Sequence, residues 1–261
     1  MNLYGILFAF GLVAACYYVW YRWRDDGGSE KRYNLFIIIE FVSIFLGARL
    51  CHCLCYEPHY YLHHIAEMLL PIAQTPDGSW HLTAYHGLAS HGGAIGAIAG
   101  IGIYRLITHH NISKILDWCA IATPLLGTFI RIGNFTNQEI VGRPTSLPWS
   151  VVFDQIDSTP RHPAQLYEAA FYLTTFVVAA MLYKRYSYTH VRPIFYFGAV
   201  MTVVALFRIG IEYLKEPQVA AETGMTLNIG QLLSIPPAII GATISIIAAT
   251  RKSDKTKNAD V

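Results

Sequence analysis

One stretch decides the fold: Arg131-Ile132-Gly133-Asn134-Phe135-Thr136-Asn137-Gln138-Glu139-Ile140-Val141-Gly142-Arg143-Pro144. It follows directly on an apolar run, Ile115 to Ile130, that is long enough to be a membrane span. Two arginines, two asparagines and a glutamate lie within the stretch. Lipid offers such groups no hydrogen-bond partners, so a polar cluster at a membrane boundary either pairs internally or meets a polar ligand. The stretch therefore predicts a membrane helix that ends at a polar site.

The composition of the whole chain agrees with a membrane protein. Of the 261 residues, 54% are hydrophobic and only 14% are charged, whereas a soluble domain usually carries about a quarter charged residues. The first apolar run, Leu3 to Trp20, is followed by Arg22 and Arg24 instead of a small-residue cleavage site, so we expect a retained span. The five cysteines are Cys16, Cys51, Cys53, Cys55 and Cys119. A disulfide framework is not expected, because cysteines such as Cys16 and Cys119 lie within apparent spans.

Seven apolar segments are candidates for membrane spans, each of which needs about 20 apolar residues. They are Leu3–Tyr21, Leu35–Cys55, His91–Ile107, Ile115–Ile130, Gln165–Tyr183, Ile194–Leu214 and Ile229–Thr250. All should be helices, because no closed barrel fits runs of this length. We expect an all-α polytopic membrane protein with about seven transmembrane helices, residues 1–261 forming a single integral membrane domain.

The distribution of Lys and Arg predicts the orientation of these helices. Thirteen of the 19 basic residues lie in alternate connections: Arg22, Arg24, Lys31, Arg32, Arg105, Lys114, Lys184, Arg185, Arg192, Arg251, Lys252, Lys255 and Lys257. Connections rich in Lys and Arg are normally cytoplasmic. The N-terminus is then extracytoplasmic, and the tail, residues 251–261, is cytoplasmic.

Six basic residues break this pattern, since each falls in an outward connection or the outer part of a span. They are Arg49, Arg131, Arg143, Arg161, Arg208 and Lys215. The outward loop from Cys55 to Ser90 contains no Lys or Arg at all, so the exceptions suggest an anion site. The alternative is that each pairs with a local carboxylate, such as Arg208 with Glu212 or Arg131 with Glu139.

Two outward loops, about residues 56–90 and 133–164, are long enough to form small arm and head structures over the helix ends. The first contains a turn signal, Pro76-Asp77-Gly78, and a strand-like piece from Trp80 to Tyr85. The second contains a short candidate strand, Trp149 to Ile156. We interpret both loops as caps and not as independent domains.

His91 opens the third span. Ser90 is suited to be the N-cap, which would place His91 in the first helical turn. The helix dipole there disfavours the imidazolium, so the ring would stay neutral and able to accept a proton, and the backbone N–H groups suit an anion. The alternative is an interfacial histidine bonded to a carbonyl. Gly92, Gly96 and Gly100 recur every four residues, which indicates a close-packing helix face.

Further charged residues gather near the other span ends. Arg208, Glu212 and Lys215 share one helical face of the sixth span, which should therefore meet the bundle interior or an aqueous cleft. Glu168, at the start of the fifth span, has the simpler interpretation of complementing a helix N-terminus. Arg49 has an alternative as a residue that snorkels to the interface.

The run Cys51-His52-Cys53-Leu54-Cys55, with three further histidines nearby, raises the question of a metal site. Its spacing fits no common zinc pattern, in which two to four residues usually separate the cysteines. We therefore expect no bound metal, and no organic cofactor is indicated either.

Four motifs follow one another along the chain: His91-Gly92-Gly93-x-Ile95-Gly96, Arg131-x-Gly133-Asn134-Phe135-x-Asn137-x-Glu139-x-x-Gly142-Arg143, Arg161-His162-Pro163-x-Gln165-Leu166-Tyr167-Glu168 and Gly230-Gln231-x-Leu233-Ser234-Ile235-Pro236. In this order they resemble the prolipoprotein diacylglyceryl transferase family across nearly the whole chain, and the second motif alone is highly specific. The resemblance implies a bacterial inner-membrane enzyme with its active site toward the outer leaflet. It would transfer diacylglycerol from phosphatidylglycerol to the lipobox cysteine of a prolipoprotein signal peptide, releasing glycerol 1-phosphate, with no nucleic acid involved.

The resemblance also implies roles for individual residues. Arg131 and Arg208 would bind the phosphate, and His91 is the candidate base. The expected substrate-binding residues are Tyr4, Arg49, Asn134, Asn137, Glu139, Gly142, Arg143, Glu212 and Lys215.

Two positions depart from the family pattern. Lys215 stands where the family often has an arginine, so the charge is kept but the planar fork is lost. Val204 replaces a common tyrosine. A polytopic anion transporter or sensor is the competing function, although such proteins typically show inverted halves with broken helices at midplane, and no half-to-half symmetry is visible.

Overall fold

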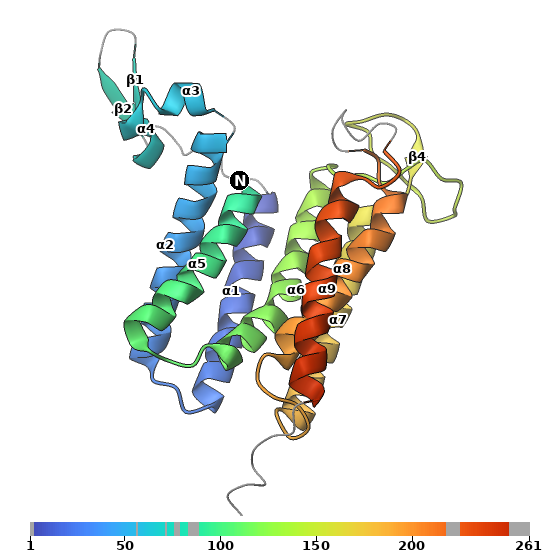
Figure 1. Cartoon of the computed structure of the whole chain (residues 1–261). Coiled ribbons are helices and arrows are strands. Elements are labelled where there is room, and N and C mark those ends of the chain that lie inside the picture. The colour runs from blue at the N-terminus through green and yellow to red at the C-terminus, as the bar shows by residue number, and fades with distance from the viewer. Residues whose placement is uncertain are drawn as a thin grey trace, which may run out of the picture. The chain divides into compact units, whose positions relative to one another are not determined.

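The computed structural model describes residues 3–55, 57–70, 72–75, 79–82, 89–217 and 225–250 (Figure 1). The described part of the chain is mostly helical. Its longer helices are α1 (Leu3–Asp25), α2 (Glu30–Cys55), α5 (Ser90–Thr108), α6 (Ser113–Thr136), α7 (Ala164–Tyr186), α8 (Phe195–Ile211) and α9 (Ile229–Thr250). The short elements are α3 (Pro58–Tyr61), α4 (Ile65–Leu69), η1 (Glu212–Leu214), β1 (Ile72–Gln74), β2 (Trp80–Leu82), β3 (Val151–Val152) and β4 (Pro160–Arg161).

A helix stands at each of the seven places where the apolar runs predict one. Within the described residues, six of them are long and apolar enough to cross a membrane, namely α1, α2, α6, α7, α8 continued by η1, and α9. The seventh, α5, is apolar but shorter. The chain is thus a multi-pass, all-α membrane protein, and a seventh crossing stays a prediction.

The fourth predicted span is wrong at its C-terminal end. The apolar run stops at Ile130, but α6 continues to Thr136 and carries Arg131 and Asn134 on its last turns. Polar side chains do not end the helix here, because Arg131 finds a partner on α7 and Asn134 finds one in the following loop.

The chain divides into two compact units, which we describe separately. The first comprises residues 1–22 and 113–261, and the second comprises residues 23–112. The first unit contains most of α1 and the helices from α6 onward, whereas α2 to α5 belong to the second.

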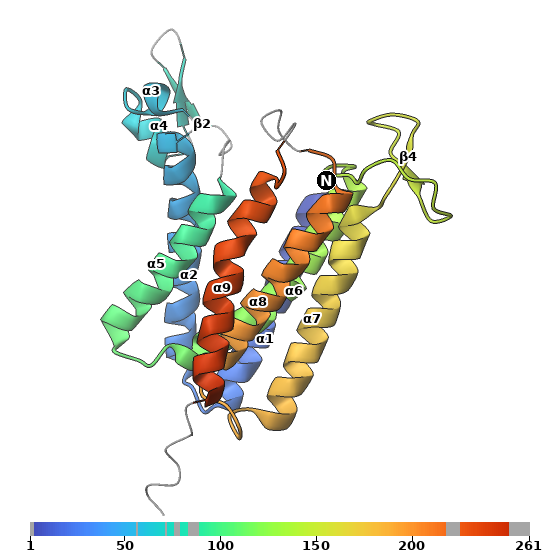
Figure 2. The same cartoon turned by 45° about the vertical axis from the view of Figure 1, so that its right-hand side comes forward.

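In the first unit, α6 packs against α7 and α8, and α8 packs along α9 (Figure 2). The backbones of α8 and α9 approach each other closely at Gly198 and Gly241. A Cβ added at either glycine would press against the backbone carbonyl oxygen of the other at 2.6 Å. Side chains larger than hydrogen would therefore force these two helices apart.

In the second unit, α2 and α5 lie along each other with glycines at the contact. A Cβ at Gly92 would collide with the carbonyl of Gly47, and one at Gly96 would collide with the carbonyl of Ser43. At Gly100 it would meet the carboxylate of Glu40 at 2.8 Å. The predicted close-packing face of the third span is confirmed.

The two loops form small structures, as expected. In the first, β1 pairs antiparallel with β2, so a strand does begin at Trp80 and is described to Leu82. The turn signal Pro76-Asp77-Gly78 and the residues from 83 to 88 lie outside the described residues. In the second, the predicted strand is shorter than expected, because only Val151–Val152 pairs with Pro160–Arg161.

Candidate active site

Four helix ends of the first unit meet at one end of the bundle, which we call the site end. Because α6 and α8 run antiparallel to α7 and α9, the C-terminal ends of the former meet the N-terminal ends of the latter (Figure 1). Charged side chains from these ends form one group, which we call the charge cluster: Arg131, Glu168, Arg208, Glu212 and Lys215.

Glu168 on α7 is the centre of the charge cluster, and its side chain is 0% exposed. Its Oε1 accepts a hydrogen bond from Lys215 Nζ at 2.9 Å and lies 3.9 Å from Arg208 Nη1. Its Oε2 lies 3.2 Å from Arg131 Nε without hydrogen-bond alignment. A carboxylate shut away from water requires positive partners, and Glu168 has three.

Glu212, the second carboxylate, is held from three sides. Its Oε1 accepts hydrogen bonds from Arg208 Nη2 and Lys215 Nζ, each at 3.0 Å. Its Oε2 accepts one from Asn228 Nδ2 at 3.1 Å, just before α9 begins. A Cβ at Gly230 would approach the same carboxylate at 2.9 Å, so this glycine leaves room for it.

The charge cluster holds three cations and two carboxylates, which leaves one positive charge in excess. The cations differ in their access to solvent. The side chain of Arg208 is 32% exposed, that of Arg131 is 12% exposed and that of Lys215 is 2% exposed. Arg208 is therefore the cation best placed to meet a ligand, while Lys215 serves as an internal counter-charge. Direct substrate binding by Lys215 stays a prediction.

The pairing predicted as an alternative for Arg208 is confirmed, since it bonds Glu212 one turn later. The one considered for Arg131 is wrong, because Arg131 forms its ion pair with Glu168. Arg131 reaches Glu139 only through an amide: Arg131 Nη1 donates to Asn134 Oδ1 at 3.4 Å, and Asn134 Nδ2 donates to Glu139 Oε1 at 2.8 Å.

Glu139 lies among amide groups. Asn137 Nδ2 donates to Glu139 Oε1 at 3.5 Å, and Gln165 Nε2 donates to the backbone oxygen of Glu139 at 2.7 Å. Tyr4 reaches the same region, within electrostatic range of Glu139 and Arg131. A Cβ at Gly133 would meet the ring of Tyr4 at 2.6 Å, so that glycine lets α1 approach α6.

Gly142 and Arg143 fasten the loop after α6 to the end of α8. The Gly142 N–H donates to the His162 oxygen at 3.1 Å, and a Cβ there would collide with this oxygen. Arg143 donates from its backbone N–H to the Leu214 oxygen at 2.8 Å and from Nε to the Lys215 oxygen at 3.1 Å. These contacts fix the backbone that carries Lys215.

Arg161 ties the same loop to the residue after Lys215. Its Nη2 contacts Asp157 Oδ2 at 2.6 Å, and its Nη1 contacts Glu216 Oε1 at 2.8 Å. Hydrogen bonding to Arg161 lowers the pKa of the Asp157 carboxyl to about 2, and the same contact raises the pKa of the Arg161 guanidinium. Both groups therefore stay charged at neutral pH.

Sequence reasoning missed Glu168 and Asn228. A carboxylate in a membrane helix is a functional candidate by default, and that signal outweighs the interpretation of Glu168 as a helix-end charge. Asn228 is marked by the spacing Asn-x-x-Gln ahead of an apolar run, the pattern of a capping box. The structure contains that box: the Gln231 N–H donates to Asn228 Oδ1 at 2.8 Å, and the Asn228 N–H donates to Gln231 Oε1 at 3.0 Å.

Arg49 belongs to the second unit, where it binds the loop that follows α2. Its Nη2 donates to the Glu67 backbone oxygen at 2.7 Å, its Nε donates to the Met68 oxygen at 3.0 Å, and its guanidinium lies over the Tyr61 ring. The side chain is buried, so the snorkelling interpretation is wrong. A substrate-binding role for Arg49 stays a prediction.

His91 lies in the first turn of α5, as expected. The N-cap is Ala89 and not Ser90, because the helix begins one residue earlier than predicted. The Ala89 N–H donates to the Ala48 oxygen at 3.0 Å, which holds this end of α5 against α2. The side chain of His91 lies outside the described residues, so its role as a base stays a prediction.

The chain is similar to known proteins along nearly its whole length. A family model described as prolipoprotein diacylglyceryl transferase matches residues 1–247. A phosphatidylglycerol–prolipoprotein diacylglyceryl transferase of Bacteroides fragilis is 45% identical over 255 residues, covering 98% of this chain and 92% of the relative. Relatives of the same name from Tolumonas auensis and Chloroherpeton thalassium are 39% identical over 256 residues and 33% identical over 239 residues. They cover 97% and 91% of this chain, and 93% and 84% of their own lengths.

Proposed function

Because the chain belongs to the prolipoprotein diacylglyceryl transferase family, we propose that the charge cluster is the phosphate-binding part of such an enzyme's active site. The protein transfers the diacylglyceryl group of phosphatidylglycerol to the lipobox cysteine thiol of a prolipoprotein. The product carries a thioether, and glycerol 1-phosphate is released. This is the first step in the maturation of bacterial lipoproteins.

The observation that carries the phosphate assignment is the positive excess around Glu168. Two guanidinium groups approach this carboxylate from α6 and α8, and Arg208 remains partly exposed. Arginine matches the oxygens of a phosphate through paired N–H donors, and charge-assisted bonds of this kind are the strong ones. Arg208 and Arg131 accordingly bind the lipid phosphate.

The chemical step is a displacement at carbon. The thiolate attacks the glycerol carbon of the diacylglyceryl group, the C–S bond forms, and the C–O bond to phosphate breaks. Negative charge then gathers on the departing phosphate. Arg131 and Arg208 neutralise this charge, and their positions are set in advance by Glu168 and Glu212, so little reorganisation is needed as the bond breaks.

The nucleophile also needs its proton removed. A cysteine thiol with a pKa of about 8.5 is mostly protonated at neutral pH, and the thiolate is the reactive form. His91 is the base that accepts this proton. Its place in the first turn of α5 supports the assignment, because a helix N-terminus favours the neutral imidazole.

The enzyme lies in the bacterial inner membrane, with its N-terminus extracytoplasmic and its tail cytoplasmic. The site end faces the outer leaflet. Support comes from the far end of the same helices, where basic residues gather next to the ends of α6, α7 and α8: Lys114, Lys184, Arg185 and Arg192. Such clusters normally mark the cytoplasmic side.

The activity test supplies purified protein with phosphatidylglycerol and a lipobox peptide. Mass spectrometry should find a peptide that carries a thioether-linked diacylglyceryl group, together with free glycerol 1-phosphate. A peptide with serine in place of the lipobox cysteine should remain unmodified. If folded protein forms no thioether product, whether it is assayed in membranes or in detergent, the proposed reaction is wrong.

A further inference from the structure

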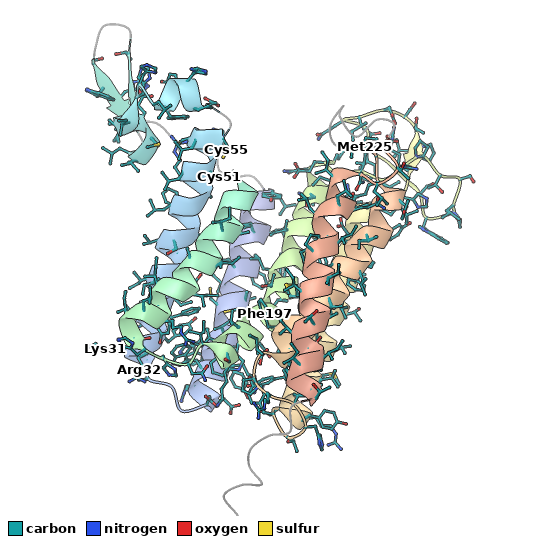
Figure 3. All side chains as sticks on the ribbon, viewed as in Figure 1. Lys31, Arg32, Cys51, Cys55, Phe197 and Met225 are labelled. Atoms are coloured by element: carbon teal, nitrogen blue, oxygen red, sulfur yellow. The ribbon has the colours of Figure 1, made fainter. Side chains whose placement is uncertain are left out.

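Two cysteines at the end of α2 face each other across one helical turn. Cys51 Sγ donates a hydrogen bond to Cys55 Sγ at 3.9 Å, and neither residue is in a disulfide. Figure 3 marks both side chains at the C-terminal end of α2. Residues four apart share a helix face, so this proximity follows directly from the spacing.

Their exposure separates this pair from the other cysteine of the run. Cys55 is exposed and Cys51 is half-buried, whereas Cys53, which lies between them in sequence, is fully buried. Cys55 is therefore the more accessible thiol of the two, and Cys51 is the partner within reach of it. The charge cluster and the proposed mechanism use neither thiol.

Cys51 also touches the first turn of α5. A Cβ at Gly92 would collide with the Cβ of Cys51, so the backbone of α5 lies directly against this residue. Gly92 directly follows His91, the proposed base. A chemical change at Cys51 would therefore act on the backbone that carries this histidine.

We propose that Cys51 and Cys55 form a reactive dithiol that is converted reversibly into a disulfide within α2. The oxidant is a small or protein disulfide. The Cys55 thiolate attacks one sulfur of that disulfide, forming a mixed disulfide and releasing one thiol. The Cys51 thiolate then attacks the Cys55 sulfur, which closes the bridge and releases the second thiol. Two protein thiols are oxidised, and one external disulfide is reduced to two thiols.

The position of the pair allows the bridge to close. A disulfide needs an S–S distance of about 2.05 Å, so the two sulfurs must approach each other from 3.9 Å. Cys55 is the last residue of α2, and the last turn of a helix has carbonyls without intrahelical partners and frays easily. That turn can unwind far enough for the two sulfurs to meet while the helix below it stays intact.

The compartment supplies the oxidant, and this point rests on the proposed orientation. With the N-terminus extracytoplasmic, the C-terminal end of α2 lies outside the cytoplasm, where disulfides form and persist. The chemistry of the pair itself does not depend on orientation and is testable in purified protein.

The test exposes purified full-length protein to oxidised glutathione, followed by a maleimide and mass spectrometry. Cys51 and Cys55 should both escape the maleimide, with the loss of two hydrogen atoms from the peptide that contains them, and dithiothreitol should restore labelling. Cys55→Ser and Cys51→Ser should not form the bridge, whereas Cys119→Ser, which removes a half-buried cysteine on α6, should behave as the wild type. A stable glutathione adduct on Cys55, or full maleimide labelling of both thiols, would overturn the proposal.

A second measurement tests the proposed dithiol and the proposed membrane orientation independently of each other. In spheroplasts that are first reduced with dithiothreitol and then washed, a membrane-impermeant maleimide should label Cys55 in the wild type, and this label should be missing from Cys55→Ser. If the bridge forms in purified protein while Cys55 is labelled only after lysis, the orientation is wrong and the dithiol stands. If Cys55 is labelled from outside but no bridge forms, the dithiol is wrong and the orientation stands.

Discussion

Two buried carboxylates lie at opposite ends of the first unit and differ in what neutralises them. Glu168 and Asp117 are both 0% exposed. Glu168 is surrounded by the cations of the charge cluster. Asp117 is satisfied by neutral donors: Oδ1 accepts the Phe197 N–H at 2.7 Å, and Oδ2 accepts the Ile194 N–H at 2.7 Å and the Tyr188 hydroxyl at 3.0 Å.

The partners of Asp117 give it a structural role. They hold the start of α8, where Ile194 has a positive φ of 82°. Burial, and then the nearby Asp117 carboxylate, raise the pKa of Tyr188, so its hydroxyl remains a donor. Every bond to this carboxylate stabilises the fold at the end of the bundle remote from the charge cluster.

The difference distinguishes a candidate binding site from a purely structural contact. At Asp117 each neutral donor gives its hydrogen to the carboxylate, so none of these hydrogen bonds is left for a ligand. Cations in excess of the carboxylates leave a charge that is still to be matched, and one of them, Arg208, stays partly exposed. The proposed phosphate site therefore depends on the surplus of cations around Glu168, and not on the burial of a carboxylate alone.

The largest effect is expected from Glu168→Gln. Removing the central carboxylate leaves Arg131 and Lys215 without their shared partner, and breaking a buried pair costs about 3–5 kcal/mol of unfolding free energy. Transfer activity per folded molecule should also fall, because the arginines lose their fixed positions. Thermal unfolding in detergent and the transfer assay measure the two effects, and unchanged activity would remove Glu168 from the site.

Arg131→Lys should come next. Lysine keeps the charge but loses the planar fork, so the protein should stay folded while the transfer rate falls by about 100-fold or more. Arg185→Lys, at the far end of α7, is the matched control and should transfer at the wild-type rate. Full activity of Arg131→Lys would contradict the phosphate assignment.

Asp117→Asn tests the other side of the comparison. The amide presents one donor to groups that are themselves donors, and a mismatch of this kind costs about 1–3 kcal/mol of unfolding free energy. Activity per folded molecule should equal that of the wild type. If Asp117→Asn lost transfer activity without losing stability, the assignment of Asp117 to a purely structural role would be wrong.

Asn228→Ser should have a smaller effect, confined to the charge cluster. Serine retains an N-cap acceptor, so the stability of α9 should change little, but no amide remains to bond Glu212. We expect transfer to slow by a factor of roughly three to ten, the value of about one hydrogen bond. Asn228→Ala, which lacks both functions, should lose stability as well. Wild-type transfer by Asn228→Ser would assign Asn228 to capping alone.

The smallest effect concerns the Asp157–Arg161 pair. Because the pKa of Asp157 is lowered from 3.8 to about 2 in the folded protein, its contribution to stability is present above pH 3.8 and is lost as the pH falls toward 2. Unfolding temperatures across this window should fall less in Asp157→Asn than in the wild type. Identical pH profiles would mean that the pair does not contribute.

The helices were largely predictable from the sequence, because length and apolar character decide where a membrane helix lies. The last predicted span, Ile229–Thr250, coincides with α9. The end of α6 was not predictable in the same way. Arg131 and Asn134 have the composition of a loop, and their contacts with Glu168 on α7 and with Glu139 in the following loop allow them to stay helical.

The site was predictable where it depends on one helix and not where it depends on several. The Arg208–Glu212 pair follows from spacing within one helix. The Lys215–Glu168 contact joins residues 47 apart in the chain and depends on the register between antiparallel helices, which no single span encodes. Arg49 and Arg131 also look alike in sequence, yet Arg49 bonds backbone carbonyls and Arg131 pairs with a carboxylate.

The contact of Gly198 with Gly241 sets the spacing between α8 and α9, and therefore the positions of the charge-cluster residues that these helices carry. Arg208 lies about ten residues beyond Gly198 on α8, or about 15 Å at 1.5 Å per residue, and Asn228 lies on the arm of α9 that reaches the same end. Replacing either glycine by alanine would push α8 and α9 apart. The displacement would grow with distance along the helices and would break the hydrogen bond between Asn228 and Glu212. The precise geometry of the site end thus depends in part on two residues further along the helices that have no side chain.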